Sequence, residues 1–256
     1  MRRIQELMFI LGWDTRCRNR QSAQALRPLL APLLQSGKPR LIEVGCGWAG
    51  LASFLPKVPM VGVDIIPVGC PQPNLLFTFG SIAALPFRDR SFPIAASVDV
   101  LEHLPLDLRE KAVSELVRVS HNAVVIACPH GRTAAQCDSD FNRQLSARNK
   151  PIPAWLEEHQ RQAHPDLPTL TSWIREAAGA TGRGIKLRVE YCEAAWVCKT
   201  VRWAAARPAI FYSAVNLLFG LLMPLIPDPG PENSYRLILI AEFCSADPPS
   251  QGSAGY

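Results

Sequence analysis

The chain has 256 residues, of which 48% are hydrophobic and 19% charged, which excludes a disordered chain and suits one large domain with a substantial core. No basic stripe carries interleaved aromatic side chains, so we expect no nucleic-acid partner. The net charge of +5 comes mainly from an N-terminal arm that carries Arg2, Arg3, Arg16, Arg18, Arg20 and Arg27.

The cysteine pattern and the first residues indicate the cellular compartment in which the protein is expected. The eight cysteines form no Cys-x-x-Cys pair and no zinc-ligand spacing, so the sequence predicts no metal site. Residues 1–13 have too short an apolar core for a secretory signal. We therefore expect a reduced, cytoplasmic protein.

Short apolar runs alternate with helical patterns, a rhythm typical of a parallel sheet covered on both faces. The predicted strands are 40–44, 60–63, 75–79, 93–98, 123–128, 185–191 and 235–243. The predicted helices are 20–35, 48–55, 106–119, 152–163 and 169–178, with two more helical stretches between 193 and 230. Residues 129–150 are polar and arginine-rich, and we expect a long loop there.

The loop after the first predicted strand has the spacing G-x-G-x-x-G, with Gly45, Gly47 and Gly50. Such glycines permit a tight turn, close approach of a ligand to the backbone, and close packing of the next segment. Asp64 ends the second predicted strand, where a carboxylate can accept the hydroxyls of a ribose. Together they predict a nucleoside-containing cofactor, although a turn that binds nothing remains an alternative.

The loop alone does not distinguish a dinucleotide from another nucleoside. Glu43, two residues before Gly45, carries a carboxylate that opposes a pyrophosphate and suits a cationic group such as an ammonium.

Four segments in order carry a family resemblance: EVGCGWAG (43–50), VGVD (61–64), ALPFRDRSF (84–92) and SVDVLEHL (97–104). They resemble the successive motifs of class I S-adenosylmethionine-dependent methyltransferases, in the small-molecule branch that includes quinone- and biotin-pathway enzymes. The resemblance covers residues 40 to about 130 well and the remainder weakly.

The resemblance implies a role for each matched residue. It implies S-adenosylmethionine as cofactor, with the methionine end held by Glu43, Gly45, Cys46, Gly47, Asp99 and Val100, the ribose held by Asp64, and the adenine beside Ile65, Ser81 and Ile82. The chain departs from the family pattern at Ser81 and Pro93, where aspartate is usual, and at His121-Asn122, where a glycine pair is common. These departures suggest altered affinity rather than loss of binding.

The alternation of predicted strands and helices, together with the family resemblance, predicts an α/β fold. We expect a Rossmann-like, doubly wound, mostly parallel seven-stranded sheet with helical cap insertions. We expect residues 1–36 to form a helical arm or cap, and 37–243 to form the methyltransferase domain. Cap insertions are expected at 129–180 and 193–230, and a disordered tail at 244–256.

The expected reaction is in-line displacement of the methyl group from the sulfonium by an acceptor nucleophile, with positioning as the main source of rate. A general base matters only if the acceptor must lose a proton. His103, beside Glu102, and His130, after the fifth strand, are the candidates, each with a structural role as the alternative. His159 and His164 lie in the expected insertion and could face either way, and a solvated helix surface is favoured for both.

Residues 209–227 form an uncharged apolar stretch at the lower limit for a membrane span. A single crossing would separate strand 235–243 from the rest of its sheet. The stretch is therefore expected either to cap the core beside the acceptor site or to lie on a membrane with help from the basic arm. The second alternative would suit a lipid-like acceptor and a membrane-associated cytoplasmic protein.

Two other functions stay open. An NAD(P)-dependent oxidoreductase is supported by the glycine spacing alone. A non-catalytic domain that serves as a scaffold or partner subunit is compatible with the departures at Ser81 and Pro93.

Overall fold

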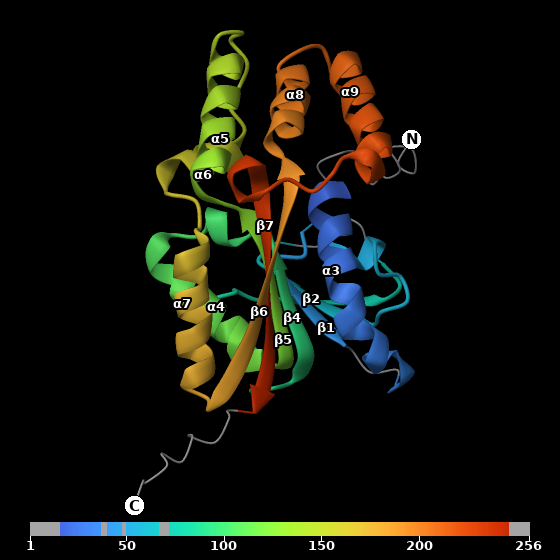
Figure 1. The fold of residues 1–256 in the computed structure, drawn as a ribbon, viewed down its shortest axis with the longest axis vertical. Coiled ribbons are helices and arrows are strands. Elements are labelled where there is room, and N and C mark those ends of the chain that lie inside the picture. The colour runs from blue at the N-terminus through green and yellow to red at the C-terminus, as the bar shows by residue number, and fades with distance from the viewer. Residues whose placement is uncertain (1–15, 37–39, 48–49, 67–71, 246–256) are drawn as a thin grey trace, which may run out of the picture.

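The computed structural model describes residues 16–36, 40–47, 50–66 and 72–245, and their centre is one seven-stranded sheet (Figure 1). The strand order is β3-β2-β1-β4-β5-β7-β6. Neighbours from β3 to β5 are parallel, whereas β7 is antiparallel to both β5 and β6. The strands are β1 (Leu41–Val44), β2 (Met60–Asp64), β3 (Leu75–Phe79), β4 (Phe92–Val98), β5 (Ser120–Pro129), β6 (Arg183–Ala194) and β7 (Ser234–Ser245). The predicted sheet is confirmed.

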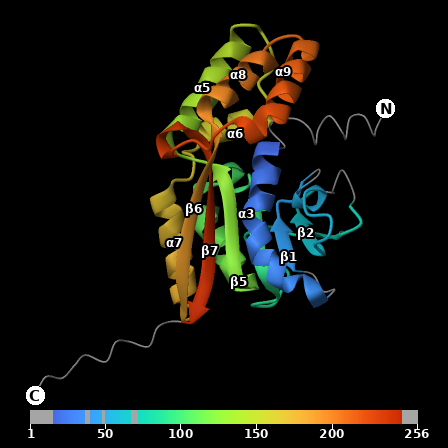
Figure 2. The same ribbon diagram turned by 45° about the vertical axis from the view of Figure 1, so that its right-hand side comes forward.

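Helices cover both faces of the sheet and its carboxyl edge. They are α3 (Gln21–Leu30), α4 (Leu106–Val119), α5 (Gly131–Ser146), α6 (Ala154–Arg161), α7 (Leu167–Gly179), α8 (Ala195–Ala205) and α9 (Ala209–Leu222). Helix α3 packs on one face, and α4 and α7 pack on the other. Helices α5, α6, α8 and α9 stand beyond the carboxyl ends of the parallel strands, as both ribbon views show (Figure 1, Figure 2).

Burial explains why the strands read as continuous apolar runs. All seven residues of β4 are buried, and so are the four residues of β1, because helices cover both faces at the centre of the sheet. Strand β3 lies at the edge and leaves Leu76 and Phe79 exposed.

The helix predicted at 48–55 is wrong within the described residues. A 3₁₀ turn, Leu51–Ser53, stands there, and residues 48–49 lie outside the described part. The side chain of Asn74 donates to the carbonyl oxygens of Leu55 (2.9 Å) and Val58 (3.0 Å), which stabilises a non-helical path into β2.

The long loop predicted at 129–150 is also wrong, since α5 occupies 16 residues of it. Its polar composition hid a helical stripe of buried residues with spacings of three and four: Ala134, Cys137, Phe141 and Leu145.

The last part of the cap insertion expected at 129–180 does not belong to the cap. Helix α7 falls inside the range 129–180, yet Leu170 and Ile174 are buried in the core beside α4 rather than beyond the strand ends. Residues 1–15 of the basic arm and 246–256 of the expected tail lie outside the described residues. Among the helices described, none is long and apolar enough to cross a membrane.

The buried face of α4 gives a direct stability test. Replacing the fully buried Leu116 with alanine leaves a cavity under the sheet, and we expect a loss of about 2–5 kcal/mol in the free energy of unfolding. Leu106→Ala on the same helix is the matched control, because that side chain is 56% exposed, and it should cost less than about 0.5 kcal/mol. Urea denaturation measures both; equal losses would contradict the assigned packing.

Candidate active site

The turn after β1 needs glycine at two positions for different reasons. Gly45 has φ +81°, and a Cβ there would lie 2.1 Å from Cγ2 of Val100, so a side chain is excluded. Gly47 has φ +50°, and a Cβ there would meet nothing within 4 Å. The backbone of Gly47 therefore borders open space that a ligand can approach.

Asp64 joins the tip of β2 to this turn. Its Oδ2 accepts the N–H of Gly47 at 2.8 Å, and its Oδ1 accepts the N–H of Ile66 at 3.1 Å. The carboxylate is partly exposed, so it retains room for further hydrogen bonds. Ile65 beside it is 75% exposed and offers an apolar surface of the kind that an adenine covers.

Glu43 is buried under the same turn, with 1% of its surface exposed. Both carboxyl oxygens lie 2.9 Å from the N–H of Leu51, and a Cβ on Gly50 would lie 2.5 Å from Oε2. Burial raises the pKa of Glu43 from its usual 4.5 to about 8, although the hydrogen bond from Leu51 opposes the rise. The side chain is thus largely protonated at neutral pH.

Cys46 lies beside these carboxyl groups and is 3% exposed. Burial, followed by the nearby charges of Glu43 and Asp64, raises the pKa of its thiol to about 12. A neutral thiol of this kind is a packing group and a poor nucleophile.

The turn after β3 lies next to Asp64, because the N–H of Gly80 donates to the carbonyl oxygen of Asp64 at 3.1 Å. Ser81 is exposed, and its Oγ accepts from the N–H of Ala83 at 3.3 Å. Ile82 is buried in the core cluster under this turn. Ser81 and Ile82 thus follow a residue that is hydrogen-bonded to the main chain of Asp64.

Asp99 follows β4 with a φ of +54° and forms buried ion pairs. Its carboxylate pairs with the guanidinium of Arg236 on β7 and lies 3.8 Å from Nη1 of Arg18. Nη2 of Arg236 also lies 3.2 Å from Oε2 of Glu193, at the end of β6. These pairs tie β4 to the two C-terminal strands beside the cofactor turn.

A cavity of about 850 Å³ extends from Asp99 to the helices beyond the carboxyl edge. Its wall combines charged groups of the strand ends with aromatic side chains from α5, α6, α9 and β7: Phe141, Trp155, Tyr212 and Tyr235. A concave, mostly apolar space with a few fixed polar groups is typical of a small-molecule site.

The two candidate bases occupy different places. His103 lines the cavity, and its Nδ1 lies 2.7 Å from Oε2 of Glu158. Nε2 of His130 lies 2.8 Å from Oγ of Ser234. Burial lowers the pKa of both histidines, so both are neutral at pH 7.

The expectation that His159 and His164 lie on a solvated surface is wrong, since both are buried. Oδ2 of Asp138 on α5 lies 2.7 Å from Nδ1 of His159 and 3.0 Å from Nε2 of His164. Although burial opposes it, these hydrogen bonds and the charge of Arg202 hold the pKa of Asp138 well below its usual range. The buried carboxylate supplies the partners that let the two histidines leave solvent.

Sequence reasoning missed Glu193, Arg236 and Asp138. The first two stand at strand ends that β6 and β7 bring to Asp99, and no local spacing reveals that contact. Asp138 lies in the segment expected to be a loop; its place on the apolar stripe of α5 was the available signal.

The raised pKa of Glu43 predicts a pH effect on stability. Between its unfolded value of 4.5 and its folded value of about 8, the folded state holds a proton that the unfolded state has lost, so stability falls as pH rises through this window. We expect Glu43→Gln to remove a fall of up to about 1.4 kcal/mol per pH unit. Urea denaturation of the cofactor-free protein from pH 5 to 8 measures it. The exposed Glu110→Gln is the control; parallel curves for the wild type and Glu43→Gln would contradict the assignment.

Comparisons with known proteins agree with this geometry. A family model described as a methyltransferase domain matches residues 42–128. Comparison with curated protein sequences gives no match. Among solved structures, an S-adenosylmethionine-dependent methyltransferase from Thermotoga maritima is similar, with a TM-score of 0.52 and 14% identity over 94% of this chain and 95% of that one. A second, from Archaeoglobus fulgidus, has a TM-score of 0.52 and 15% identity over 88% of this chain and 94% of that one.

The matched segment contains the glycine turn, Asp64 and the end of β4, while the neighbours share the seven-stranded architecture around it. The cofactor of this kind of domain is S-adenosylmethionine. Residues 42–128 therefore match a methyltransferase domain, and the fold of the chain is that of S-adenosylmethionine-dependent methyltransferases.

Proposed function

We propose that this protein transfers the methyl group of S-adenosylmethionine to a small molecule bound in the 850 Å³ cavity. The observation that carries the proposal is the position of Asp99, which follows β4 next to the glycine turn and also lines the cavity. A cofactor on the turn and an acceptor in the cavity would meet at this residue.

The reaction needs little from the protein besides positioning. An acceptor nucleophile attacks the methyl carbon, the carbon–sulfur bond breaks, and its electron pair neutralises the sulfonium. Holding the two reactants at contact distance away from water supplies up to about 7–11 kcal/mol in favourable cases. His103 lines the cavity and is better placed than His130 to accept a proton from the acceptor.

The cofactor contacts in this proposal are those that the resemblance implies. Asp64 accepts the ribose hydroxyls, and the backbone from Gly45 to Gly47 borders the methionine end. Glu43, protonated in the free protein, ionises when the cofactor's ammonium approaches the turn. Ile65, Ser81 and Ile82 flank the adenine, and Asp99 and Val100 border the methionine from β4.

The other two functions fit the site less well. The carboxylate of Asp64 at the glycine turn disfavours the pyrophosphate of NAD(P), and a pyrophosphate offers the buried Glu43 no cationic partner. A non-catalytic scaffold has no use for a large cavity beside the cofactor turn, and an occluded pocket would have supported that alternative.

A lipid-like acceptor is the second part of the proposal. Helix α9 packs on α8 through Tyr212, Val215 and Phe219, so it forms part of the cap. It also exposes a set of large apolar side chains: Ile210, Phe211, Leu217, Leu218, Leu221 and Leu222. An exposed apolar helix face beside a substrate cavity suits a protein that rests on a membrane and takes its acceptor from it.

Removing the ribose carboxylate tests the cofactor assignment. We expect Asp64→Ala to weaken binding of S-adenosylhomocysteine by about 10- to 100-fold. The variant loses the charged hydrogen bonds to the sugar and also the hydrogen bond that holds the Gly47 amide in place. Isothermal titration calorimetry measures the affinity, with the exposed Glu110→Ala as control. Unchanged affinity in Asp64→Ala would exclude the assigned ribose site.

Filling the cavity tests the acceptor assignment. Ala205 on α8 lines the cavity. Ala205→Trp should therefore exclude the acceptor sterically and lower kcat/KM at least about tenfold for each acceptor that the wild-type protein methylates. The affinity for S-adenosylhomocysteine should stay within about twofold. A radiolabelled methyl-transfer assay over amine, hydroxyl and lipid-like acceptors measures turnover, with Ala209→Trp on the exposed start of α9 as control. Equal turnover in both variants would place the acceptor elsewhere.

Flotation with vesicles of anionic lipid tests the membrane contact. We expect a substantial fraction of the wild type to float, and Leu218→Glu with Leu221→Glu to reduce that fraction at least twofold, because both side chains are exposed on α9. Leu106→Glu, on an exposed site of α4, is the matched control. A wild-type protein that stays wholly at the bottom of the gradient rules the contact out.

A further inference from the structure

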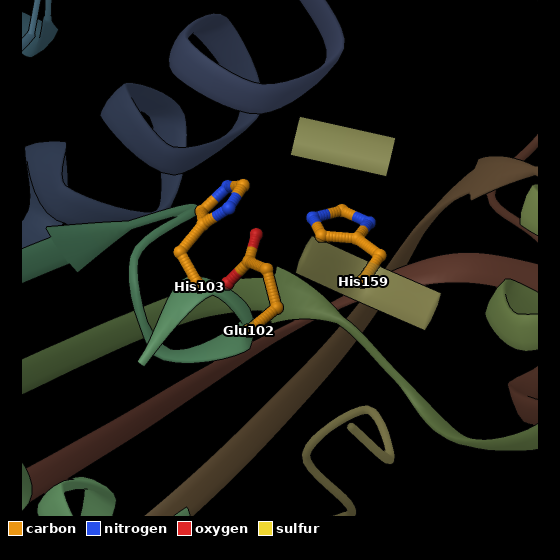
Figure 3. Close-up of side chains that lie close together, drawn as sticks. All are labelled: Glu102, His103 and His159. Atoms are coloured by element: carbon orange, nitrogen blue, oxygen red, sulfur yellow. The ribbon is translucent and has the colours of Figure 1, made fainter. Parts of the chain in front are cut away.

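Three side chains with metal-binding atoms meet at the cavity wall: Glu102, His103 and His159. Their donor atoms all lie within 4.8 Å of one another, and all three residues line the cavity. Glu102 and His103 belong to the 3₁₀ turn after β4, Leu101–His103, and His159 comes from α6. Figure 3 shows a carboxylate oxygen of Glu102 between the two imidazole rings.

Glu102 lacks the partners that a buried carboxyl group needs. It is 1% exposed, and neither of its carboxyl oxygens has a hydrogen-bond partner among the described residues. The buried Arg109 donates to the main-chain oxygen of Glu102, at 3.2 Å, and not to its carboxyl group. A buried polar group without a hydrogen-bond partner lowers the stability of the folded state by about 1–3 kcal/mol, and more if it is charged. A ligand that is not part of the protein chain can remove this cost by binding the group.

Each histidine is oriented by a carboxylate on its far side. Nδ1 of His159 lies 2.7 Å from Asp138, and its Nε2 is buried without a partner in the described part of the chain. Nδ1 of His103 lies 2.7 Å from Glu158, which leaves Nε2 available. A carboxylate that holds one ring nitrogen, fixing the tautomer so that the other nitrogen can bind a metal, is the usual surrounding of a metal-binding histidine.

We propose that Glu102, His103 and His159 bind a divalent transition-metal ion of the Zn²⁺, Co²⁺ or Mn²⁺ type at the wall of the acceptor cavity. Two imidazoles and one carboxylate favour such ions over Mg²⁺ or Ca²⁺, which prefer oxygen ligands. Donors about 2.1 Å from a shared ion lie about 3.4 Å apart, so atoms that lie within 4.8 Å of one another must approach by up to about 1.4 Å to share an ion.

The neighbouring group Asp138, His159 and His164 also has the right atoms, but its carboxylate is already engaged. Oδ2 of Asp138 is hydrogen-bonded to both imidazoles, and the hydroxyl of Tyr235 donates to Oδ1 at 3.0 Å. That group therefore supports His159 rather than forming a second site.

What the ion does rests on the proposed methyl transfer. Three protein donors leave positions that face the cavity, where an acceptor hydroxyl can bind. With the ion bound, His103 serves as a ligand and not as the base: a metal-bound hydroxyl loses its proton to solvent more readily, its oxygen attacks the methyl carbon, and the carbon–sulfur electron pair stays on sulfur. The products are a methyl ether, S-adenosylhomocysteine and one proton.

The test uses chelator-treated full-length protein without cofactor, titrated with CoCl₂ by absorption and with ZnCl₂ by calorimetry. We expect one equivalent of each metal to bind. Glu102→Gln and His159→Gln should weaken binding by more than about 100-fold, and Glu158→Gln by about 10- to 100-fold as an outer partner. His121→Gln, an exposed histidine on β5, is the matched control and should leave the affinity unchanged. Unchanged affinity for S-adenosylhomocysteine in each variant shows that it has folded.

Several results would overturn the proposal. They are absence of stoichiometric binding, equal binding by Glu102→Gln and His121→Gln, a sulfur-to-cobalt charge-transfer band that reveals cysteine ligands, or binding of MgCl₂ in preference to both metals. Acetohydroxamate, a bidentate oxygen ligand, should change the cobalt spectrum if positions face the cavity, and an unchanged spectrum contradicts that part. Because no cofactor is present, failure here is distinct from failure of Asp64→Ala to weaken S-adenosylhomocysteine binding.

Discussion

The hydrogen bond from the Gly47 amide to the Asp64 carboxylate fixes the relation between the first two strands at their carboxyl ends. It holds the glycine turn against β2 and leaves the remaining face of the carboxylate toward open space. The turn lies where the sheet order reverses, between β1 and β4, which is where ligands bind in open α/β sheets. Glu43 is buried beneath this turn, and it can ionise there when a cationic group of a ligand approaches.

The second constraint is a set of buried charges that attaches the cap to the sheet. Asp138 on α5 contacts His159 on α6, Arg202 on α8 and Tyr235 on β7. Asp99, Glu193 and Arg236 join the ends of β4, β6 and β7 in the same way. Because Asp138 and Arg236 each contact more than one element, the cap is held to the sheet, and the cavity between them keeps its shape without a bound acceptor.

The sequence predicted the sheet because central parallel strands are buried on both faces and read as apolar runs bounded by turns. It predicted the cofactor turn because only glycine fits beside Val100 at Gly45, and that requirement is visible as spacing. It failed at 48–55, where the distant Asn74 stabilises a non-helical path, and at α5, whose apolar stripe is interrupted by the buried Asp138. The buried state of His159 was equally hidden, because its partner lies on another helix and the contact depends on tertiary structure.

The central claim is that Asp64 and the glycine turn bind a sulfonium nucleoside. Calorimetry of the wild-type protein with S-adenosylhomocysteine and, separately, with NADH tests it most directly. The account predicts one site that binds S-adenosylhomocysteine and at least about tenfold weaker binding of NADH, because a pyrophosphate would meet the carboxylate of Asp64 and supply no ammonium for Glu43. Binding of NADH with no detectable binding of S-adenosylhomocysteine would contradict it.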